Sequence, residues 1–370
     1  MDTKLKARVI ALYLPQYHPI PENDKWWGKG FTEWTNVGKA KSLFKGHYQP
    51  RVPADLGYYD LRVSETRKAQ AEMAKEYGIE GFCYWHYWFG NGKRLIERPF
   101  NEVLSSGDPD FPFCLAWANE TWKGFDHGLK NRNILIEQLY LGVEDYKAHF
   151  YEVLPAFKDK RYITVDGKPL FMIYKPLASQ EIKVFMEVWK KLAKENGLSG
   201  IYFVGHHNDL RNNLNEIAET GVDAVNTTRL NNYIINHRSI YQKISSRIKN
   251  FVWGTAAAYA IPYKLMSQYF LVPEEDKLPN VFPSIIPGWD HTPRSGREGL
   301  VMTDSTPDLF ELHVKKTVDL VDEKNPENKI IFIKSWNEWA EGNYMEPDLK
   351  WGKKYLEALK RQIVKEEIKE

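Results

Sequence analysis

Two glutamates near the carboxyl end of the chain, Glu338 and Glu341, have the residue type and the spacing that could carry chemistry. They directly follow Lys329–Ser335, an apolar run with the length and composition of a β-strand. One carboxyl group acting as an acid and a second acting as a base or nucleophile is the arrangement that cleaves glycosidic bonds. With a tryptophan on either side of Glu338, the pattern predicts acid/base chemistry on a sugar. Solvated loop charges are the simpler alternative.

Eight runs along the chain have strand character, and most are continuously apolar, as expected for strands buried on both faces of a parallel sheet. Helical periodicity in Ser64–Tyr77 and Ser179–Asn196, and a helix start at Thr306-Pro307, place helices between them. The alternation predicts a single (β/α)8 barrel domain over residues 1–370. A doubly wound sheet is the alternative, but the first run is not followed by a Gly-rich phosphate turn. The eight runs are Arg8–Leu14, Glu80–Trp85, Pro112–Trp117, Pro169–Tyr174, Gly200–Val204, Val222–Val225, Val281–Pro287 and Lys329–Ser335.

Two connections between these runs are too long for ordinary loops, Pro15–Val63 and Thr227–Asn280. The first is rich in tryptophan and tyrosine, and the second is expected to be partly helical between Tyr233 and Tyr269. Long connections after barrel strands commonly build the substrate site. A hydrophobic plug over the barrel mouth is the alternative for the first connection.

Polar and aromatic residues gather just after the predicted strands, which in a barrel all end at one rim. Sugars bind through stacking on aromatic rings and through hydrogen bonds from their hydroxyls, and this inventory offers both. Tyr84, Trp117, Tyr174, His206, Trp289 and Glu338 are expected to ring one pocket. The candidate substrate-binding residues are Tyr13, Trp26, Trp27, Tyr84, His86, Tyr87, Trp117, Asn119, Glu120, Tyr174, His206, His207, Trp289, Asp290, Trp336 and Asn337.

Simpler interpretations exist for several of these residues. His86 could be a core histidine, Glu120 could pair with a basic residue, and Trp289-Asp290 could be a packed turn. His206 and His207 are adjacent, so on a strand they face opposite sides and cannot easily share a metal ion. We expect no metal site and no cofactor, because the sequence has no phosphate-binding or dinucleotide motif.

The composition narrows the classes of partner. The 51 basic and 49 acidic residues nearly cancel, which argues against a nucleic acid partner. Aromatic residues make up 14% of the chain, more than core packing alone explains when so many adjoin polar residues. No uninterrupted apolar segment is long enough to span a membrane, and no secretory signal is recognised at Met1, so we expect a cytoplasmic protein that binds carbohydrate. The oligomeric state stays open.

Long motifs in this sequence resemble the WbsX-like family of bacterial polysaccharide loci, and the resemblance covers nearly the whole chain. The motifs are Leu-Pro-Gln-Tyr-His-Pro from Leu14, Trp-Trp-Gly-Lys-Gly-Phe from Trp26, Tyr-Trp-His-Tyr-Trp-Phe from Tyr84, Trp-Ala-Asn-Glu-Thr-Trp from Trp117 and Trp-Asn-Glu-Trp-Ala-Glu-Gly from Trp336. That family is similar to the endo-α-mannosidases of glycoside hydrolase family 99, which are (β/α)8 barrels with two catalytic glutamates three residues apart.

The resemblance implies a retaining mechanism through a 1,2-anhydrosugar. One glutamate deprotonates the sugar 2-hydroxyl and the other protonates the leaving oxygen; by position, Glu338 would be the base and Glu341 the acid. The residues around the pair depart from the mannosidase pattern, since Asn337 precedes Glu338 and Trp339-Ala340 separates the two. The sugar is therefore left open.

The sequence favours a glycoside hydrolase acting on a bacterial or plant polysaccharide. A glycosyltransferase of lipopolysaccharide, O-antigen or capsule synthesis is the first alternative, and a non-catalytic glycan-binding barrel is the second. A different catalytic pair is also conceivable, with Glu120 as the acid and Glu338 as the nucleophile. It ranks lower because the corresponding acid of the large Asn-Glu barrel families follows the fourth strand, not the third.

Overall fold

The computed structural model describes residues 5–124, 129, 133–207, 214–237 and 259–365. Eight parallel strands form a closed barrel, because β3 pairs with β7 in addition to the continuous order that runs from β3 through β1 to β7. The eight strands match the eight predicted runs, so the predicted (β/α)8 barrel is confirmed. They are β1 (Arg8–Tyr13), β2 (Gly81–His86), β3 (Phe113–Trp117), β7 (Lys168–Ile173), β8 (Tyr202–His207), β9 (Ala224–Thr227), β11 (Val281–Ile285) and β13 (Ile330–Ile333).

The strands are buried on both faces, as their apolar composition predicts. The four residues of β13, Ile-Ile-Phe-Ile, have no exposed surface, and Val9–Leu12 of β1 are equally inaccessible. The first and last barrel strands pair in parallel, with Val9 opposite Ile331 and Ala11 opposite Ile333. The core therefore lies inside the barrel and between the barrel and its helices.

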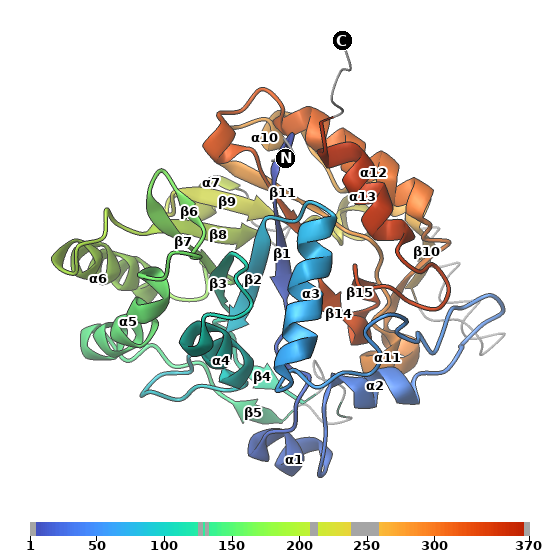
Figure 1. The fold of residues 1–370 in the computed structure, drawn as a ribbon, viewed down its shortest axis with the longest axis horizontal. Coiled ribbons are helices and arrows are strands. Elements are labelled where there is room, and N and C mark those ends of the chain that lie inside the picture. The colour runs from blue at the N-terminus through green and yellow to red at the C-terminus, as the bar shows by residue number, and fades with distance from the viewer. Residues whose placement is uncertain (1–4, 125–128, 130–132, 208–213, 238–258, 366–370) are drawn as a thin grey trace.

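Helices cover the outside of the barrel (Figure 1). The helix predicted at Ser64–Tyr77 is α3, that at Ser179–Asn196 is α6, and α12 begins where Thr306 accepts a hydrogen bond from the Leu309 amide. The helices are α3 (Ser64–Glu76), α4 (Arg98–Ser106), α5 (Val143–Phe157), α6 (Glu181–Glu195), α7 (Leu214–Ala218), α10 (Pro273–Asp276), α12 (Pro307–Val321) and α13 (Lys354–Ile363).

The two long connections carry further elements, and α1 and α2 of the first one lie toward the carboxyl ends of the strands (Figure 1). The connection after β1 holds α1 (Pro21–Trp27) and α2 (Glu33–Lys39). The connection after β9 is helical at Tyr233–His237 and at Tyr263–Tyr269, as predicted, and also contains β10 (Tyr259–Pro262); residues 238–258 of this prediction lie outside the described part.

Short elements complete the rim and the edges. They are β4 (Trp122–Lys123), β5 (Ile134–Ile136), β6 (Thr164–Val165), α9 (Tyr263–Met266), α11 (Thr292–Ser295), β12 (Leu300–Thr303), β14 (Asn337–Glu338) and β15 (Asn343–Tyr344). The hairpin of β14 and β15 follows the last barrel strand and carries the predicted carboxylate pair.

Candidate active site

A cavity of about 460 Å³ opens at the carboxyl end of the barrel, where catalytic residues of this architecture lie. Both predicted carboxylates, Glu338 and Glu341, line it, together with aromatic and polar residues from most of the barrel strands. Its lining is Leu14, Gln16, Trp85, Tyr87, Ala118, Glu120, Thr121, Trp122, Tyr174, Lys175, His206, Thr228, Leu230, Asn231, Trp289, His291, Arg294, Lys334, Glu338 and Glu341.

The turn that carries the two glutamates is fixed to the first barrel strand. The buried amide of Asn337 accepts a hydrogen bond from the Leu14 backbone at 2.8 Å and donates one to the Leu14 carbonyl at 3.0 Å. A single helical turn, Trp339–Glu341, follows Glu338 and ends in Glu341. Gly342 terminates this turn with a φ of 58°. Asn337 is thus a structural bridge whose side chain does not line the cavity.

Glu338 lies in an environment that keeps its proton. This residue is 5% exposed, and the Trp85 indole donates to Oε1 at 3.0 Å. Burial, with the negative charge of Glu341 beside it, raises the pKa of Glu338 to about 7. The Lys334 ammonium, 3.6 Å from Oε2, opposes this shift without cancelling it.

Glu341 lies in an environment that keeps its charge. Burial disfavours the ionised form, but the positive charge of Arg294, a hydrogen bond from Glu338 and the positive charge of Lys334 together outweigh it, so the pKa of Glu341 is lowered. The Arg294 guanidinium contacts Glu341 Oε1 at 2.5 Å and Glu33 Oε2 at 3.1 Å. The two neighbouring carboxyl groups are therefore pushed in opposite directions, which is how one site can hold an acid and a base at the same pH.

Three predicted binding residues line this cavity, Tyr174, His206 and Trp289. His206 stacks on Tyr174 with ring centroids 5.3 Å apart, and Lys334 Nζ lies 5.5 Å from the centre of the Trp289 ring. Burial and the Lys334 ammonium lower the pKa of His206 to about 3, so the imidazole is neutral. Because Asn226 Oδ1 accepts from His206 Nδ1 at 2.6 Å, and the Asn226 amide nitrogen donates elsewhere, Nε2 is left as an acceptor for a sugar hydroxyl.

Tyr87 and Glu120, two further predicted residues, also line the cavity. Glu120 pairs with Lys175 at 2.5 Å, and both are partly exposed, which places this pair at the rim. Glu120 and Glu338 thus open onto the same cavity, as the barrel prediction requires.

The other predicted binding residues on strands face outward, away from the cavity. Tyr84 packs between Tyr13 and Phe100, and His86 bonds His149 of α5 at 2.7 Å. Trp117 packs on Phe185 of α6. The prediction that these three side chains face the cavity was therefore wrong by one position along each strand. Successive side chains of a strand alternate between its faces, and it is Trp85 and Ala118 that line the cavity.

Tyr13, Asn119, His207 and Trp336 are likewise outside the cavity lining. The Tyr13 hydroxyl donates to Gln70 of α3 at 2.7 Å, and Asn119 ties the end of β3 to the Lys175 backbone at 2.9 and 2.8 Å. Trp336 is fully buried against Phe82, and His207 is buried next to His206 on the same strand. All four support the site from behind.

Trp26 and Trp27 of α1 are half-buried and do not reach the cavity lining. Trp26 packs edge-on against Trp122, which does line the cavity, and Trp27 stacks on Phe31. In the described residues these two tryptophans therefore pack behind the rim. This agrees better with the hydrophobic plug than with a surface on which a sugar ring stacks.

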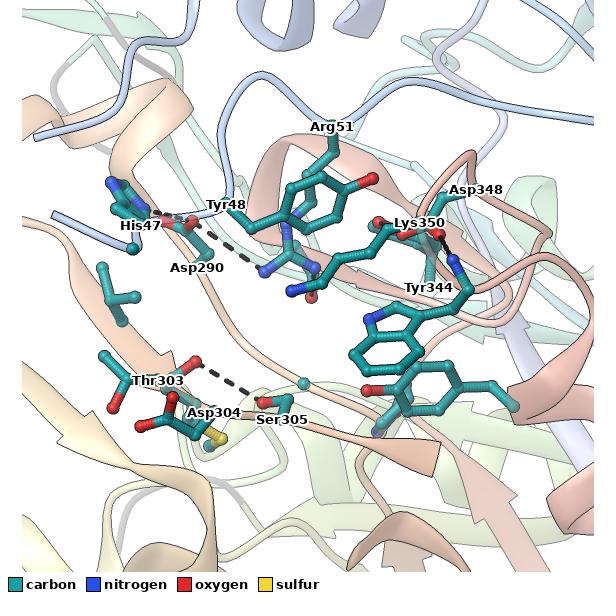
Figure 2. A pocket seen from close by; sticks show the side chains of 18 of the residues that line it. His47, Tyr48, Arg51, Asp290, Thr303, Asp304, Ser305, Tyr344, Asp348 and Lys350 are labelled. Carbon is teal, nitrogen blue, oxygen red and sulfur yellow. Dashed lines mark hydrogen bonds and ion pairs between the residues drawn. The ribbon is translucent and has the colours of Figure 1, made fainter. Parts of the chain in front are cut away.

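Asp290 is also not a cavity residue, although its neighbours Trp289 and His291 are. Figure 2 shows its carboxylate turned into a separate, smaller pocket, where it meets His47 and Arg51. His47 contacts Oδ2 at 2.8 Å, and the Thr292 amide donates to Oδ1 at 3.0 Å. The Asp290 backbone amide donates to the Glu341 carbonyl at 2.6 Å, so this residue anchors the turn that carries Glu338 and Glu341.

Sequence reasoning missed several residues that line the cavity. The prediction contains Tyr84 and His86 but not Trp85, which lies between them. It also omits Trp122 and Lys175, which follow predicted strands close to the predicted residues Glu120 and Tyr174. Arg294 and Lys334 gave no signal, because a single basic residue in a sequence does not show which carboxylate it will meet.

Within the residues that the structure describes, no group of three or more histidine, cysteine, aspartate or glutamate side chains is arranged to hold a metal ion. The helices in the same ranges are all too short or too polar to cross a membrane.

The fold and the site together define a (β/α)8 barrel with a carboxylate pair in an aromatic-lined cavity at the carboxyl ends of its strands. The chain belongs to the family described as glycosyltransferase WbsX, whose model matches residues 9–359. The resemblance seen in the sequence is thereby confirmed.

Two curated relatives match almost the whole chain. Both are called uncharacterized protein WxcX, from Xanthomonas campestris pv. campestris strains B100 and ATCC 33913, and they are 34% and 33% identical over 367 residues. The matches cover 98% of this chain but 50% of each relative, so the chain spans about half the length of the curated relatives it matches.

Solved structures with the same fold include glycoside hydrolases. A glycoside hydrolase-like protein has a TM-score of 0.60 at 14% identity, covering 99% of this chain and 96% of that chain. The family 99 endo-alpha-mannosidase from Bacteroides thetaiotaomicron has a TM-score of 0.52 at 16% identity, covering 96% and 95%. At such low identities these likenesses establish the barrel fold.

Proposed function

We propose that this chain is a glycoside hydrolase that cleaves a polysaccharide or oligosaccharide with Glu338 and Glu341. The observation that carries the proposal is the pair itself. Two carboxyl groups three residues apart line one sugar-sized cavity, and their surroundings shift their pKa values in opposite directions. A glycosidase needs one carboxyl group protonated and one ionised at the same pH.

The proposed reaction retains the anomeric configuration and passes through a 1,2-anhydrosugar. One glutamate takes the proton of the sugar 2-hydroxyl while O2 attacks C1, and the other gives its proton to the departing oxygen as the C1–O bond breaks. Water then attacks C1 and opens the three-membered ring. In this step the second glutamate takes a proton from water and the first returns its proton to O2, so both groups end as they began.

Two role assignments within the pair can be distinguished. The resemblance makes Glu338 the base and Glu341 the acid, whereas the electrostatics of the cavity favour the proton on Glu338 and the charge on Glu341. In either case the reactive form of the pair carries one proton. His206 Nε2 accepts a hydrogen bond from a hydroxyl of the bound sugar, and the rings of Tyr174 and Trp289 pack against the sugar ring.

The test is product analysis on bacterial and plant polysaccharides, with the anomeric configuration of fresh product followed by NMR. We expect cleavage with retention, unaffected by a chelator and by nucleoside diphosphates. Glu338→Gln and Glu341→Gln serve as controls for contaminating activity. Sugar transfer that depends on a nucleotide-sugar donor would overturn the proposal in favour of the transferase implied by the family's name, and glycan binding without turnover would favour a binding protein.

A further inference from the structure

Lys334 is a cationic residue inside the cavity that the proposed reaction does not use. It follows β13, where its backbone amide donates to the Ile285 carbonyl at 3.0 Å. Its side chain is 12% exposed and lines the cavity, with Nζ 5.5 Å from the centre of the Trp289 ring. An ammonium group in such a place has lost most of its hydration and needs partners.

The other two cations of the cavity lining are already neutralised. Lys175 lies 2.5 Å from Glu120 at the rim. Arg294 lies between two carboxylates, Glu33 at 3.1 Å and Glu341 at 2.5 Å. Neither cation is left over for a charged ligand.

The contact of Lys334 is looser than these. Its nearest carboxylate oxygen is Glu338 Oε2 at 3.6 Å, beyond the usual 2.7–3.2 Å of a direct hydrogen bond. The other oxygen of Glu338 is taken by the Trp85 indole. The raised pKa of Glu338, about 7, means that Glu338 balances the Lys334 ammonium only in part below that pH. The ionised Glu341 also attracts Lys334, but its direct partner is Arg294.

We propose that Lys334 binds a carboxylate carried by the sugar next to Glu338, and that the substrate is therefore an acidic glycan that contains a uronic acid or a similar carboxylated sugar. This inference rests on the proposed function. A single loosely paired ammonium matches a singly charged carboxylate. A doubly charged phosphate would call for a second cation, and the other two in the lining are held in closer ion pairs. Trp289 and Tyr174 provide the apolar faces against which the ring of such a sugar packs.

The first part of the test compares polymers that differ only in charge. Polygalacturonate, alginate and a glucuronate-rich bacterial exopolysaccharide are each assayed beside their carboxyl-reduced forms, with mannan, galactan and arabinoxylan as neutral polymers. We expect cleavage of an acidic polymer with kcat/KM at least about tenfold above that of its reduced form. Equal cleavage of both forms, or cleavage of neutral polymers alone, would overturn the inference while leaving the hydrolase proposal intact; cleavage of none of these polymers would count against both.

The second part uses variants on the acidic polymer and on its reduced form. Lys334→Gln is expected to raise KM for the native polymer about tenfold or more and to leave KM for the reduced form within about twofold, and Lys334→Arg to recover most of the loss. The double variant Lys175→Gln/Glu120→Gln is the matched control, because it removes an ion pair from the same cavity without changing its net charge and should affect both forms alike. If Lys334→Gln also affects both forms equally, Lys334 does not read substrate charge.

Discussion

Glu338 and Glu341 are only three residues apart, yet one carboxyl group faces a tryptophan and a loosely placed lysine while the other is held by an arginine. We expect Glu338→Gln and Glu341→Gln each to lower turnover by about 10²–10⁴-fold, the usual contribution of a positioned acid or base. An aryl glycoside with a good leaving group should restore much of the activity to the variant that lacks the acid, because departure then needs little protonation. The measurement is kcat on paired natural and activated substrates.

This comparison also decides the roles. Restoration in Glu338→Gln assigns the acid to Glu338, as the electrostatics favour, and restoration in Glu341→Gln assigns it to Glu341. Unchanged circular dichroism spectra show that the variants fold. Turnover close to that of the wild type in both variants would contradict the proposed pair.

The pH dependence of kcat/KM follows from the same two groups. The reactive pair holds one proton, so activity should rise as Glu341 ionises below the ordinary glutamate pKa and fall as Glu338 loses its proton near pH 7. These two limbs belong to the pair as a whole. Initial rates between pH 3 and 9 test the bell shape, and a profile flat up to pH 9 would contradict the raised pKa of Glu338.

The sequence could predict that Glu338 and Glu341 lie together at the end of the last barrel strand, where both line the cavity. It could not predict which neighbouring aromatic residues face that cavity. Trp85 lines the cavity while Tyr84 and His86 face the helices. In a strand that is apolar throughout, no alternation of polar and apolar residues marks which face is inward. The run Tyr-Trp-His-Tyr-Trp therefore locates a strand end without telling which of its rings meets a ligand.

At the scale of elements, the buried carboxyl group of Glu346 links the turn that carries Glu338 and Glu341 to helix α3 and to the connection after β1. It accepts hydrogen bonds from Gln70 of α3 at 2.6 Å, from the Tyr59 hydroxyl at 2.9 Å and from the Trp339 indole at 2.6 Å. Glu346→Gln should cost about 1–3 kcal/mol of the free energy of unfolding, because its new amide group replaces an acceptor among donors. Urea unfolding at fixed pH measures this cost.

The same variant has a pH signature. Burial raises the pKa of Glu346 to about 7, so the folded state holds this proton more tightly than the unfolded chain does. Its contribution to stability is complete below about pH 4.5 and is lost as pH rises through about 7. The wild type should thus lose stability between these values more steeply than Glu346→Gln, and equal slopes would show that Glu346 is ionised in the folded protein.

Gly342 ends the turn that carries Glu338 and Glu341, and its backbone is left-handed, with a φ of 58°. A Cβ there would lie 2.6 Å from Asp290 Cβ and 3.0 Å from Arg51 Cζ. Gly342→Ala should therefore destabilise the protein by more than the about 1–2 kcal/mol of the backbone conformation alone, and displace Glu341 enough to lower kcat at least about tenfold.

Gly352 provides the matched control. Its φ is 55°, but nothing lies within 4 Å of the position of a Cβ. Gly352→Ala should lower the free energy of unfolding only by the cost of a left-handed backbone at an alanine, about 1–2 kcal/mol, and leave kcat unchanged. If the two alanine variants are equally stable and equally active, the close approach of Asp290 to the turn does not matter.

The elements themselves were largely predictable, since eight apolar runs of strand length became eight barrel strands. What the sequence could not show is which distant segments meet. Arg294 on α11 joins Glu33 on α2 to Glu341, and residues 47–51 reach Asp290; these contacts depend on the closed barrel and on no local pattern.

At the scale of the whole molecule, the barrel closes tightly where β2 meets β3. A Cβ on Gly81 would lie 2.4 Å from the Pro112 carbonyl oxygen, which belongs to the backbone and cannot move aside cheaply. Gly81→Ala should lower the free energy of unfolding by about 3 kcal/mol or more. Gly38→Ala on α2, with nothing within 4 Å, should be neutral or stabilise by about 0.5–1 kcal/mol. Calorimetric unfolding of both variants tests this, and equal stabilities would contradict the tight seam.

The pairing of β1 with β13 has a consequence for the order in which the protein can be made. A chain synthesised only as far as β11 holds seven of the eight barrel strands, with the edges of β1 and β11 still waiting for a partner. It also lacks both carboxylates, which emerge from the ribosome just after β13. The segment made after β11 therefore delivers the closing strand and both carboxylates together, so the nascent chain lacks the carboxylate pair until its sheet can close.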